Sequence, residues 1–360
     1  QLYIGDGRKP FKVGHLFMLQ GKDHVEVSHA LPGDIVAVAK VDEIHFDAVL
    51  HDAAEDSHVH LAPLPFPVPV YGLAVEPKRH GDEQRAWEIL GKLAAEDPCL
   101  RIEHVAATNE TVLYGLGELH LRIVLERLRE VYRFDVQTRP PRIAYRETVT
   151  APAEGHYRHK KQSGGAGQFA EVFLRIEPLA RGAGFEFADE VRGGAIPGQF
   201  IPAVEKGVRE VLAYGAIAGF PVADVRVVVY DGKHHSVDSK DIAFATAGRK
   251  AFMAAIREAR PVVLEPIVQI EIAVPEHSVG DVTSDLSLRR GLVTGTSGLG
   301  SGTVAIGGHV PEAELVDYQS RLNAMTSGQG RYTVALSHYE AVPPAVQQTL
   351  MGQYRVREDD

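Results

Sequence analysis

Apolar and polar residues follow different periods in successive blocks of this chain. In residues 14–50, short apolar runs such as 34–41 alternate with turn residues, which predicts part of a small antiparallel β-barrel. The proline-rich segment 62–72 then breaks both the strand and the helix pattern, as a linker does. We therefore expect residues 1–70 to hold part of a barrel and a linker.

The next block, residues 71–147, alternates the two periods in a defined order. A strand pattern at LAVEPK precedes a charged helical stretch at 82–95, and two strand-like runs follow around Leu100 and Val112. A second helix is predicted by an apolar stripe at i, i+3, i+4 and i+7. The stripe consists of Leu121, Val124, Leu125 and Leu128. With a closing strand at 134–136, the order is that of a ferredoxin-like split βαβ domain.

Residues 148–261 read as strands combined with two helices. In the run DVRVVVYDG, Val225, Val227 and Val229 recur at period two and share one face of a strand. The segment 201–215 is predicted to be a helix that tolerates Pro202 in its first turn, and a second helix is predicted from about Lys240. This block is expected to be an α+β domain.

Residues 262–341 repeat the strand and helix order of block 71–147. Val268, Ile270, Ile272 and Val274 alternate with polar positions and predict a strand with one wet face. Helices near 280–290 and 313–325 and a closing strand at TVALSHY complete a second ferredoxin-like pattern. A terminal helix is predicted after Pro343, so 342–360 is a separate helix and tail.

Composition and charge exclude few classes of protein. The chain has 360 residues and a net charge of −10, which argues against a uniformly basic nucleic-acid coat but permits a local cationic patch. Cys99 is the sole cysteine, and no apolar run is long enough to cross a bilayer, so we expect a cytoplasmic protein without membrane partners. The chain opens on Gln1 inside a strand pattern, and we interpret it as a fragment.

The segment HKKQSGGAGQF, which begins at His159, is the most unusual stretch of the chain. It lacks the G-x-x-x-x-G-K-[ST] pattern of a phosphate-binding Walker loop, and that pattern occurs nowhere in the chain. One interpretation is a hairpin turn whose glycines supply positive φ. The other is a protruding loop whose small residues approach RNA while Arg158, Lys160 and Lys161 hold phosphates.

Two other clusters invite a catalytic or metal interpretation. HDAAEDSHVH offers His51, Asp52, Asp56, His58 and His60, but the spacing fits no standard zinc pattern and a solvated loop is expected.

The second cluster consists of His235, Ser236 and Asp238. These neighbours in sequence are not expected to form a hydrolytic triad. We predict no catalytic residue and no metal ligand in this chain.

Six segments resemble bacterial elongation factor G, a translational GTPase, in that family's own order. They are LAVEPK with AAEDP, YGLGELHLRIVLERL, HKKQSGGAGQF, GGAIPGQFIPAVEKGVREVL, GFPVADVRVVVYDGKHHSVDSKDIAFATAGRKAF and EPIVQIEIAVPEHSVGDVTSDLSLRRG. By this resemblance, residues 1–70 are the C-terminal part of domain II and a linker, 71–147 domain III, 148–261 domain IV, 262–341 domain V, and 342–360 a helix that packs on domain IV. Domain IV is expected to be ribosomal-S5-domain-2-like, and the whole chain α+β and multidomain.

The resemblance implies a ribosome-binding role. Domain IV of the family enters the decoding region beside tRNA and mRNA, and GTP hydrolysis with Mg²⁺ occurs in an N-terminal domain that this chain lacks. The implied partners are therefore ribosomal RNA, tRNA and mRNA, and the implied state is a monomer. The implied tip residues are Lys160, Lys161, Gly164, Gly165, Ala166, Gly167, Gln168, His234, His235, Val237 and Asp238. In domain V, Arg289 and Arg290 are implied to contact ribosomal RNA.

Ala166 departs from the family pattern. The family typically carries arginine between the tip glycines, and alanine can neither pair with phosphate nor stack on a base. The alternatives to a translocase are a divergent paralogue that acts in ribosome recycling or a specialised step, a ribosome-protection protein, and an RNA-binding module without a GTPase.

Overall fold

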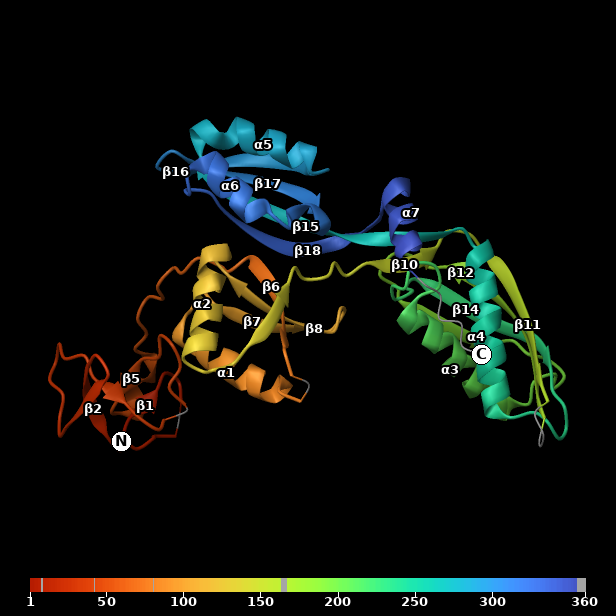
Figure 1. Ribbon diagram of the computed structural model, residues 1–360, viewed down its shortest axis with the longest axis horizontal. Helices are drawn as coiled ribbons and strands as arrows, with labels where there is room; N and C mark the ends of the chain where they lie inside the picture. The colour runs from red at the N-terminus through yellow and green to blue at the C-terminus, as the bar shows by residue number, and fades with distance from the viewer. Residues whose placement is uncertain (8, 42, 80, 163–166, 355–360) are drawn as a thin grey trace. The chain divides into compact units, whose positions relative to one another are not determined.

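The computed structural model describes residues 1–360 except 8, 42, 80, 163–166 and 355–360. The chain divides into two compact units, 1–141 and 142–360 (Figure 1). Each unit combines mixed α and β structure, as the sequence predicts.

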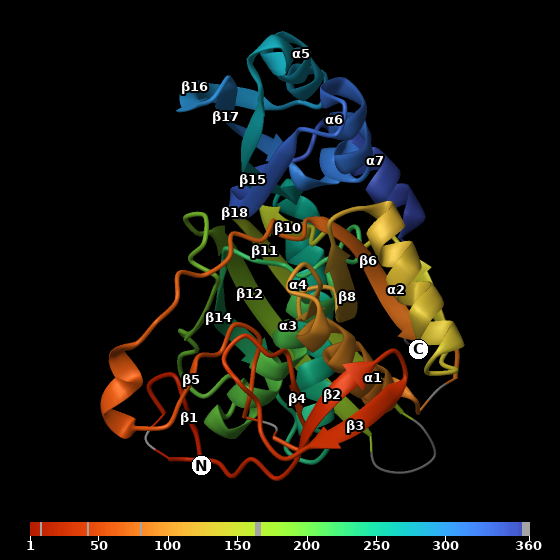
Figure 2. The same cartoon turned by 90° about the vertical axis from the view of Figure 1, so that its left-hand side faces the viewer.

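The N-terminal 70 residues form small sheets with short strands. Strand β1 (Tyr3–Ile4) pairs with β5 (Leu50–His51), while β2 (Leu16–Gln20) pairs with both β3 (Asp23–Val27) and β4 (Ala37–Val38). The β2–β3 hairpin is visible in Figure 2. The run 34–41 was expected to be a longer strand, but only two of its residues pair, and Ile35 is 89% exposed. A 3₁₀ helix, η1, spans Ala54–His58.

Residues 71–139 confirm the first predicted split βαβ order. The elements are β6 (Tyr71–Pro77), α1 (Glu83–Glu96), β7 (Arg101–Val105), β8 (Glu110–Gly115), α2 (Glu118–Glu130) and β9 (Val136–Arg139). The antiparallel sheet has the order β7-β8-β6-β9, which is ferredoxin-like. The predicted stripe on α2 faces the core through Leu121, Val124 and Leu128. The closing strand begins at Val136, two residues later than predicted, because Phe134 packs into the core before the strand starts.

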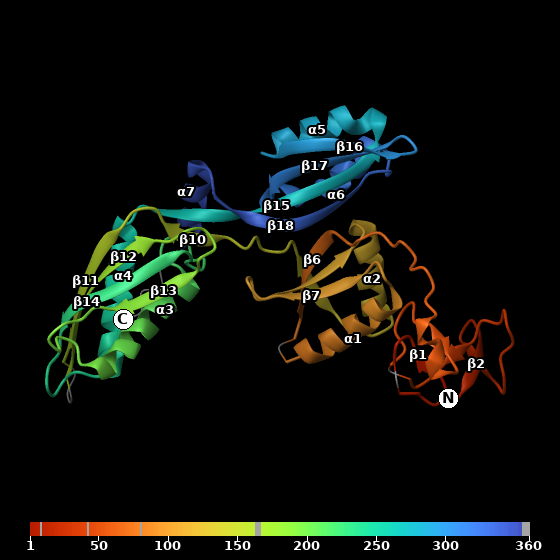
Figure 3. The ribbon, with the colours of Figure 1, turned by 180° about the vertical axis from the view of Figure 1, so that it is seen from behind.

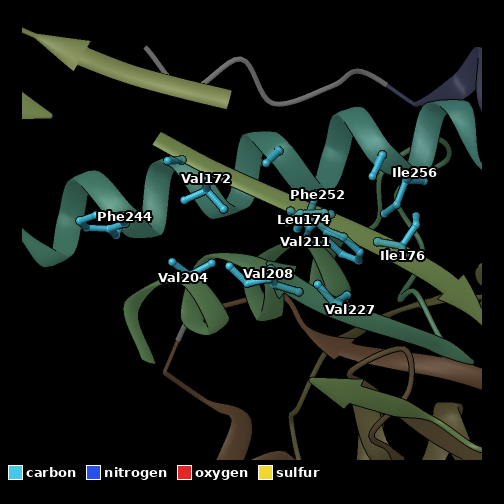
Figure 4. Close-up of a cluster of buried hydrophobic side chains, with 14 of the residues drawn as sticks. Val172, Leu174, Ile176, Val204, Val208, Val211, Val227, Phe244, Phe252 and Ile256 are labelled. Carbon is cyan, nitrogen blue, oxygen red and sulfur yellow. The ribbon is translucent and has the colours of Figure 1, made fainter. Parts of the chain in front are cut away.

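The next domain is built on a four-stranded sheet of order β11-β12-β14-β13. Its elements are β11 (Ala153–Lys161), β12 (Gln168–Pro178), β13 (Phe185–Asp189), η2 (Gly198–Phe200), α3 (Ile201–Tyr214), β14 (Val225–Lys233) and α4 (Asp241–Glu258). Helices α3 and α4 pack on the same side of this sheet (Figure 3). Figure 4 shows Leu174, Val227, Val208 and Phe252 meeting in the core between them.

Glycines allow α3 and α4 to approach closely. A Cβ at Gly207 would lie 2.0 Å from the carbonyl oxygen of Ala245 on α4. At Gly155 on β11 the corresponding distance to the Ala251 oxygen is 2.1 Å. Both distances are too short for any side-chain atom, so the packing of this domain requires glycine at both positions.

The second ferredoxin-like domain has the sheet order β16-β17-β15-β18, to which β10 (Arg146–Val149) adds on the edge of β15. Its elements are β15 (Pro261–Pro275), η3 (Glu276–Ser278), α5 (Val279–Leu288), β16 (Leu292–Gly300), β17 (Thr303–Pro311), η4 (Glu312–Leu315), α6 (Tyr318–Thr326) and β18 (Arg331–Ala341). The predicted helix at 313–325 is divided, because η4 ends at Leu315 and α6 begins at Tyr318.

The last helix, α7 (Pro344–Gln353), packs beside the start of β15. Gln347 accepts a hydrogen bond from the Val263 N–H at 3.1 Å and donates one to the Pro261 carbonyl at 3.3 Å. Val346 and Leu350 pack against a small cluster that includes Ala218.

Glu147 on β10 is a buried carboxylate in the same part of the unit, with 1% of its surface exposed. Its two oxygens accept four backbone N–H groups of the loop that follows α3. The donors are Ala216 at 2.6 Å, Ile217 at 3.0 Å, Ala218 at 2.8 Å and Phe220 at 3.1 Å. This one side chain therefore satisfies the donors of a buried turn.

Candidate nucleic-acid interface at the hairpin tip

Strands β11 and β12 form a hairpin, and the loop after β14 lies beside its end. The predicted loop is thus flanked by antiparallel strands, as the hairpin interpretation requires, with Lys161 paired to Gln168. Gly164, Gly165 and Ala166 lie outside the described residues. The structure brings the other predicted residues of the two loops together around one depression of about 580 Å³, except that Val237 does not line it.

Backbone hydrogen bonds fasten the two loops to each other. The Phe169 N–H donates to the Asp238 carbonyl at 2.9 Å, and the Ser239 hydroxyl donates to the Phe169 carbonyl at 2.8 Å. The same Ser239 oxygen accepts the His235 N–H at 2.9 Å. Ser239 is therefore the residue through which both loops are held, and sequence reasoning did not single it out.

Gly167 lies against the Asp238 side chain where the loops meet. A Cβ at this position would lie 2.9 Å from the carboxyl carbon of Asp238. The close approach favours one of the five small residues between the two strands without any reference to a ligand.

His235 Nδ1 faces its own loop and lies 3.4 Å from an Asp238 carboxylate oxygen. Its Nδ1 accepts the N–H groups of Val237 at 3.3 Å and Asp238 at 3.2 Å. A nitrogen that accepts carries no proton, so the neutral ring has its proton on Nε2. His235 can therefore offer an N–H donor to a ligand while its other nitrogen shapes the loop. His234 instead uses Nδ1 to contact the Ala195 carbonyl at 3.2 Å.

Cationic side chains surround the depression. Lys160 and Lys161, both exposed, contribute from β11, and Lys233 contributes from the end of β14. On the other face of the hairpin, the amide oxygen of Gln168 lies 3.0 Å from His159 Nε2. Exposed cations around a backbone-lined depression suit phosphate and RNA backbone contacts.

Glu171 is a buried acid beneath these cations, with 5% of its surface exposed. One oxygen lies 2.9 Å from His156 Nε2, and the other lies 3.6 Å from Lys233 Nζ. Burial raises the pKa of this carboxyl, but the His156 hydrogen bond and the charges of Lys233 and Arg158 together hold the pKa below its usual value. Glu171 is therefore ionised at neutral pH and orients basic side chains. Alternation in AEVFLRI could have placed it on the face opposite the core.

Arg289 and Arg290 lie in the second ferredoxin-like domain and bind acidic partners there. Arg289 contacts Asp285 and Asp317, each at 2.8 Å. Arg290 makes a bidentate contact with the buried Glu265 at 2.5 and 2.9 Å, and these bonds raise its pKa. Their predicted contact with ribosomal RNA stays a prediction, to which the structure adds an intramolecular role.

The histidine-rich segment near His51 differs in part from the predicted solvated loop. His51 is buried, with 9% of its surface exposed, and both ring nitrogens face carbonyl oxygens. His58 and His60 are exposed, as expected for a loop. Among the described residues, no group of three or more potential ligand side chains is arranged to hold a metal ion.

The GELH segment has a structural arrangement of its own. Glu118 begins α2, as predicted. His120 Nδ1 accepts the Leu116 N–H at 3.1 Å, so its Nε2 carries the proton that is donated to Asp97 at 2.9 Å. This bond connects the GELH and AAEDP segments within one domain.

Comparison with known proteins gives matches along most of the chain. Residues 66–140 match the family model for elongation factor G domain III, 141–260 that for domain IV, and 262–350 that for the elongation factor G C-terminus. An elongation factor G-like protein of Thermotoga maritima is 42% identical over 96% of this chain and 50% of its own length. Elongation factor G of Aquifex pyrophilus is 40% identical over 95% of this chain and 48% of its own length.

A crystal structure of a protein from Thermus thermophilus has the same fold. It superposes with a TM-score of 0.77 at 39% identity, over 98% of this chain and 52% of that one.

The consecutive domains of this chain are those of an elongation factor G-type protein. The chain belongs to the elongation factor G family, and it spans about half the length of the curated relatives that it matches. No helix among the described residues is long and apolar enough to cross a membrane.

Proposed function

We propose that this chain is the ribosome-binding part of a translational GTPase that promotes GTP-dependent movement of tRNA and mRNA during elongation. The observation that carries the proposal is the tip itself. Two loops from separate strands are tied through Ser239 and Asp238 into one end surface, which carries Lys160, Lys161 and His234. A small rigid end surface with cations and backbone donors suits entry between RNA strands.

No covalent chemistry is assigned to the tip. His235 uses Nδ1 inside the loop, and Ser239 uses its hydroxyl to bond Phe169, so neither group is free to act as a base or nucleophile. In the proposed mechanism the tip binds and positions RNA, and the hydrogen-bonded loops transmit force to it.

GTP and Mg²⁺ are assigned to a domain outside this chain. The sequence contains no Walker pattern, and the glycine-rich segment runs into β12, not into a helix N-terminus that could bind phosphate. The residues present therefore do not fit a nucleotide. We further propose that the protein works as a monomer in the cytoplasm.

Sedimentation with ribosomes tests the binding part of this proposal. The full chain is mixed with vacant ribosomes at stated ionic strength, because phosphate contacts weaken steeply with salt. We expect co-sedimentation that an intact elongation factor G displaces. A chain that stays in the supernatant at low salt, or that is not displaced, would contradict the proposal.

A divergent paralogue is a second candidate, favoured by Ala166. An arginine at that position could pair with phosphate or stack on a base, and alanine does neither. Such a paralogue would act in ribosome recycling or another specialised step. If Ala166→Arg changes no ribosomal rate in the full-length protein, the argument from this position fails. A ribosome-protection role has no observation of this kind in its favour.

A further inference from the structure

We call the domain that contains the β11–β12 hairpin the hairpin domain. Its sheet, of order β11-β12-β14-β13, has a second face, which α3 and α4 do not cover. Pairing places Lys160 opposite Phe169, Arg158 opposite Glu171, and His156 opposite Phe173 on β11 and β12. Opposed residues of antiparallel strands project to the same side. The buried partners Ala170, Val172 and Leu174 alternate with them and face the helices. The face opposite the helices therefore carries basic side chains on β11 beside two aromatic rings on β12, with the buried Glu171 between the rings.

Flat rings lie on this face in two places. The His156 ring stacks on Phe173 with ring centroids 4.1 Å apart and planes inclined by 14°. The Arg158 guanidinium lies over the Phe169 ring, 5.2 Å from its centroid. Phe169 and Phe173 are partly exposed, while His156 and Arg158 are exposed. Phe173 lies four positions after Phe169 on the strand, about 13 Å at the usual rise, so the two rings would serve different bases.

The exposed charges near these rings are mainly basic. Arg158 and Lys160 project from β11, and Lys233 projects from β14 opposite Glu171. Glu171 is buried and hydrogen-bonded to His156, so it orients the His156 ring and does not present its charge to the solvent. Asp231, opposite Phe173, is the exposed acid nearest along the strands.

The depression at the tip continues onto this face. Arg158, Lys160 and Phe169 line it together with Lys233 and His234. A strand of RNA held at the tip loops could therefore follow the depression onto the rings.

We propose that the outer face of this sheet is a stacking platform for single-stranded RNA, additional to the tip loops. Bases stack on Phe169 and on the His156–Phe173 pair, while Arg158, Lys160 and Lys233 hold the phosphates. An open sheet whose rings stack bases beside basic residues is an arrangement that RNA-binding domains use. The inference rests on the proposed function for its biological setting, but it concerns the outer face of the sheet next to the tip loops and is tested without ribosomes.

Fluorescence anisotropy tests the platform directly. The probe is a labelled single-stranded RNA of about ten nucleotides and mixed sequence, titrated with the full chain at low salt. Phe173→Leu and Phe169→Leu keep an apolar side chain on the strand but remove the flat ring. We expect each to weaken binding by about fivefold or more, because one base stacked on an aromatic ring contributes about 1–3 kcal/mol. Circular dichroism confirms that the variants fold.

Phe185→Leu is the matched control. Phe185 lies on β13 of the same sheet and packs against the core cluster, so its replacement should leave RNA binding unchanged. Two competitors test the preference for single-stranded RNA: the same oligomer as DNA, and duplex RNA. Neither should compete better than the single-stranded RNA itself. Duplex RNA that binds more tightly would overturn the platform.

Three further results would overturn the proposal. They are no binding of the oligomer at low salt, unchanged affinity in both leucine variants, and a loss in Lys160→Ala and Lys233→Ala alone, which would indicate charge without stacking. Ribosome co-sedimentation separates this failure from that of the proposed function. If the leucine variants sediment normally and the oligomer does not bind, the platform is excluded and the ribosomal role stands.

Discussion

The Phe169 N–H donates to the Asp238 carbonyl oxygen at 2.9 Å, and this bond joins two loops that are separated by about seventy residues of sequence. Phe169 is the second residue of β12, and Asp238 lies in the loop between β14 and α4, so the bond fixes that loop to the sheet. The two loops at the tip are therefore structurally coupled, and a substitution in either loop should change the stability of the other.

Ser239→Ala tests that coupling. The hydroxyl donates to the Phe169 carbonyl and accepts the His235 N–H, so its removal leaves both groups without a partner. We expect the loops to lose about 1–3 kcal/mol of local stability, seen as faster hydrogen exchange at the amides of His235 and Phe169. Ser236→Ala, at an exposed position in the same loop, is the control and should leave exchange unchanged. Equal exchange in the two variants would refute the coupling.

Gly207→Ala should destabilise the hairpin domain although alanine is the better helix former. The new Cβ would lie 2.0 Å from the Ala245 carbonyl oxygen, and the helices must separate to relieve the overlap. We expect the free energy of unfolding to fall by about 1–3 kcal/mol, because the cost of the overlap is greater than the gain in helix propensity of about 1 kcal/mol.

Gly91→Ala is the matched control for that substitution. Gly91 lies within α1, and a Cβ there would meet nothing within 4 Å. The stability of its own domain should rise by up to about 1 kcal/mol. Calorimetry measures both variants, and shifts of the same sign would show that helix packing does not decide the outcome.

Glu147→Ala should weaken unit 142–360 strongly. The substitution removes the acceptor of four buried N–H groups in the loop after α3. We expect a loss of at least about 3 kcal/mol, because buried donors without partners keep their full desolvation cost. Chemical denaturation measures it against Glu210→Ala, an exposed position on α3. A loss below about 1 kcal/mol would mean that water replaces the carboxylate.

His51 predicts a pH dependence in the N-terminal part of the chain. Its ring nitrogens lie 2.7 Å from the Gly5 carbonyl and 2.5 Å from the Ala53 carbonyl, and only the imidazolium can donate to both. These two bonds, with the charges of Asp56 and Asp52, raise the pKa of His51 although burial lowers it.

The sign of the effect follows from that raised pKa. The contribution of His51 to stability is complete below the unfolded pKa of about 6.5 and is lost as pH rises through the higher folded pKa. Nuclear magnetic resonance titration should find His51 titrating above the ordinary histidine value of about 6.5. His51→Gln should abolish the loss of stability above neutral pH. A pKa for His51 at or below about 6.5 would contradict this account.

Periodic segments are where the sequence predicts the fold well. The α2 stripe and the alternation of Val225, Val227 and Val229 each face a core as expected, because one apolar face must be buried whatever the neighbouring domains do. The run 34–41 fails for the complementary reason. Ile35 finds no apolar surface to pack against among the described residues, so alternation alone does not produce a long strand.

The site could be predicted only in part. The glycine segment and the histidine loop are recognisable as sequence, whereas Ser239 and Glu171 act through partners about 70 and 60 residues away. Pairing of β12 with β14 brings those partners together, and a bulge near Phe173 shifts the register on the way. No local pattern in the sequence reports such a shift.

Single-turnover movement of mRNA on pre-translocation ribosomes tests the central proposal most directly. The full-length protein is mixed with GTP, and His234→Ala with His235→Ala is the tip variant. We predict fast movement by the wild type and slow movement by the variant, with ribosome-stimulated GTP hydrolysis retained in both. Hydrolysis by the wild type without any movement of mRNA would contradict a translocase and direct attention to subunit splitting.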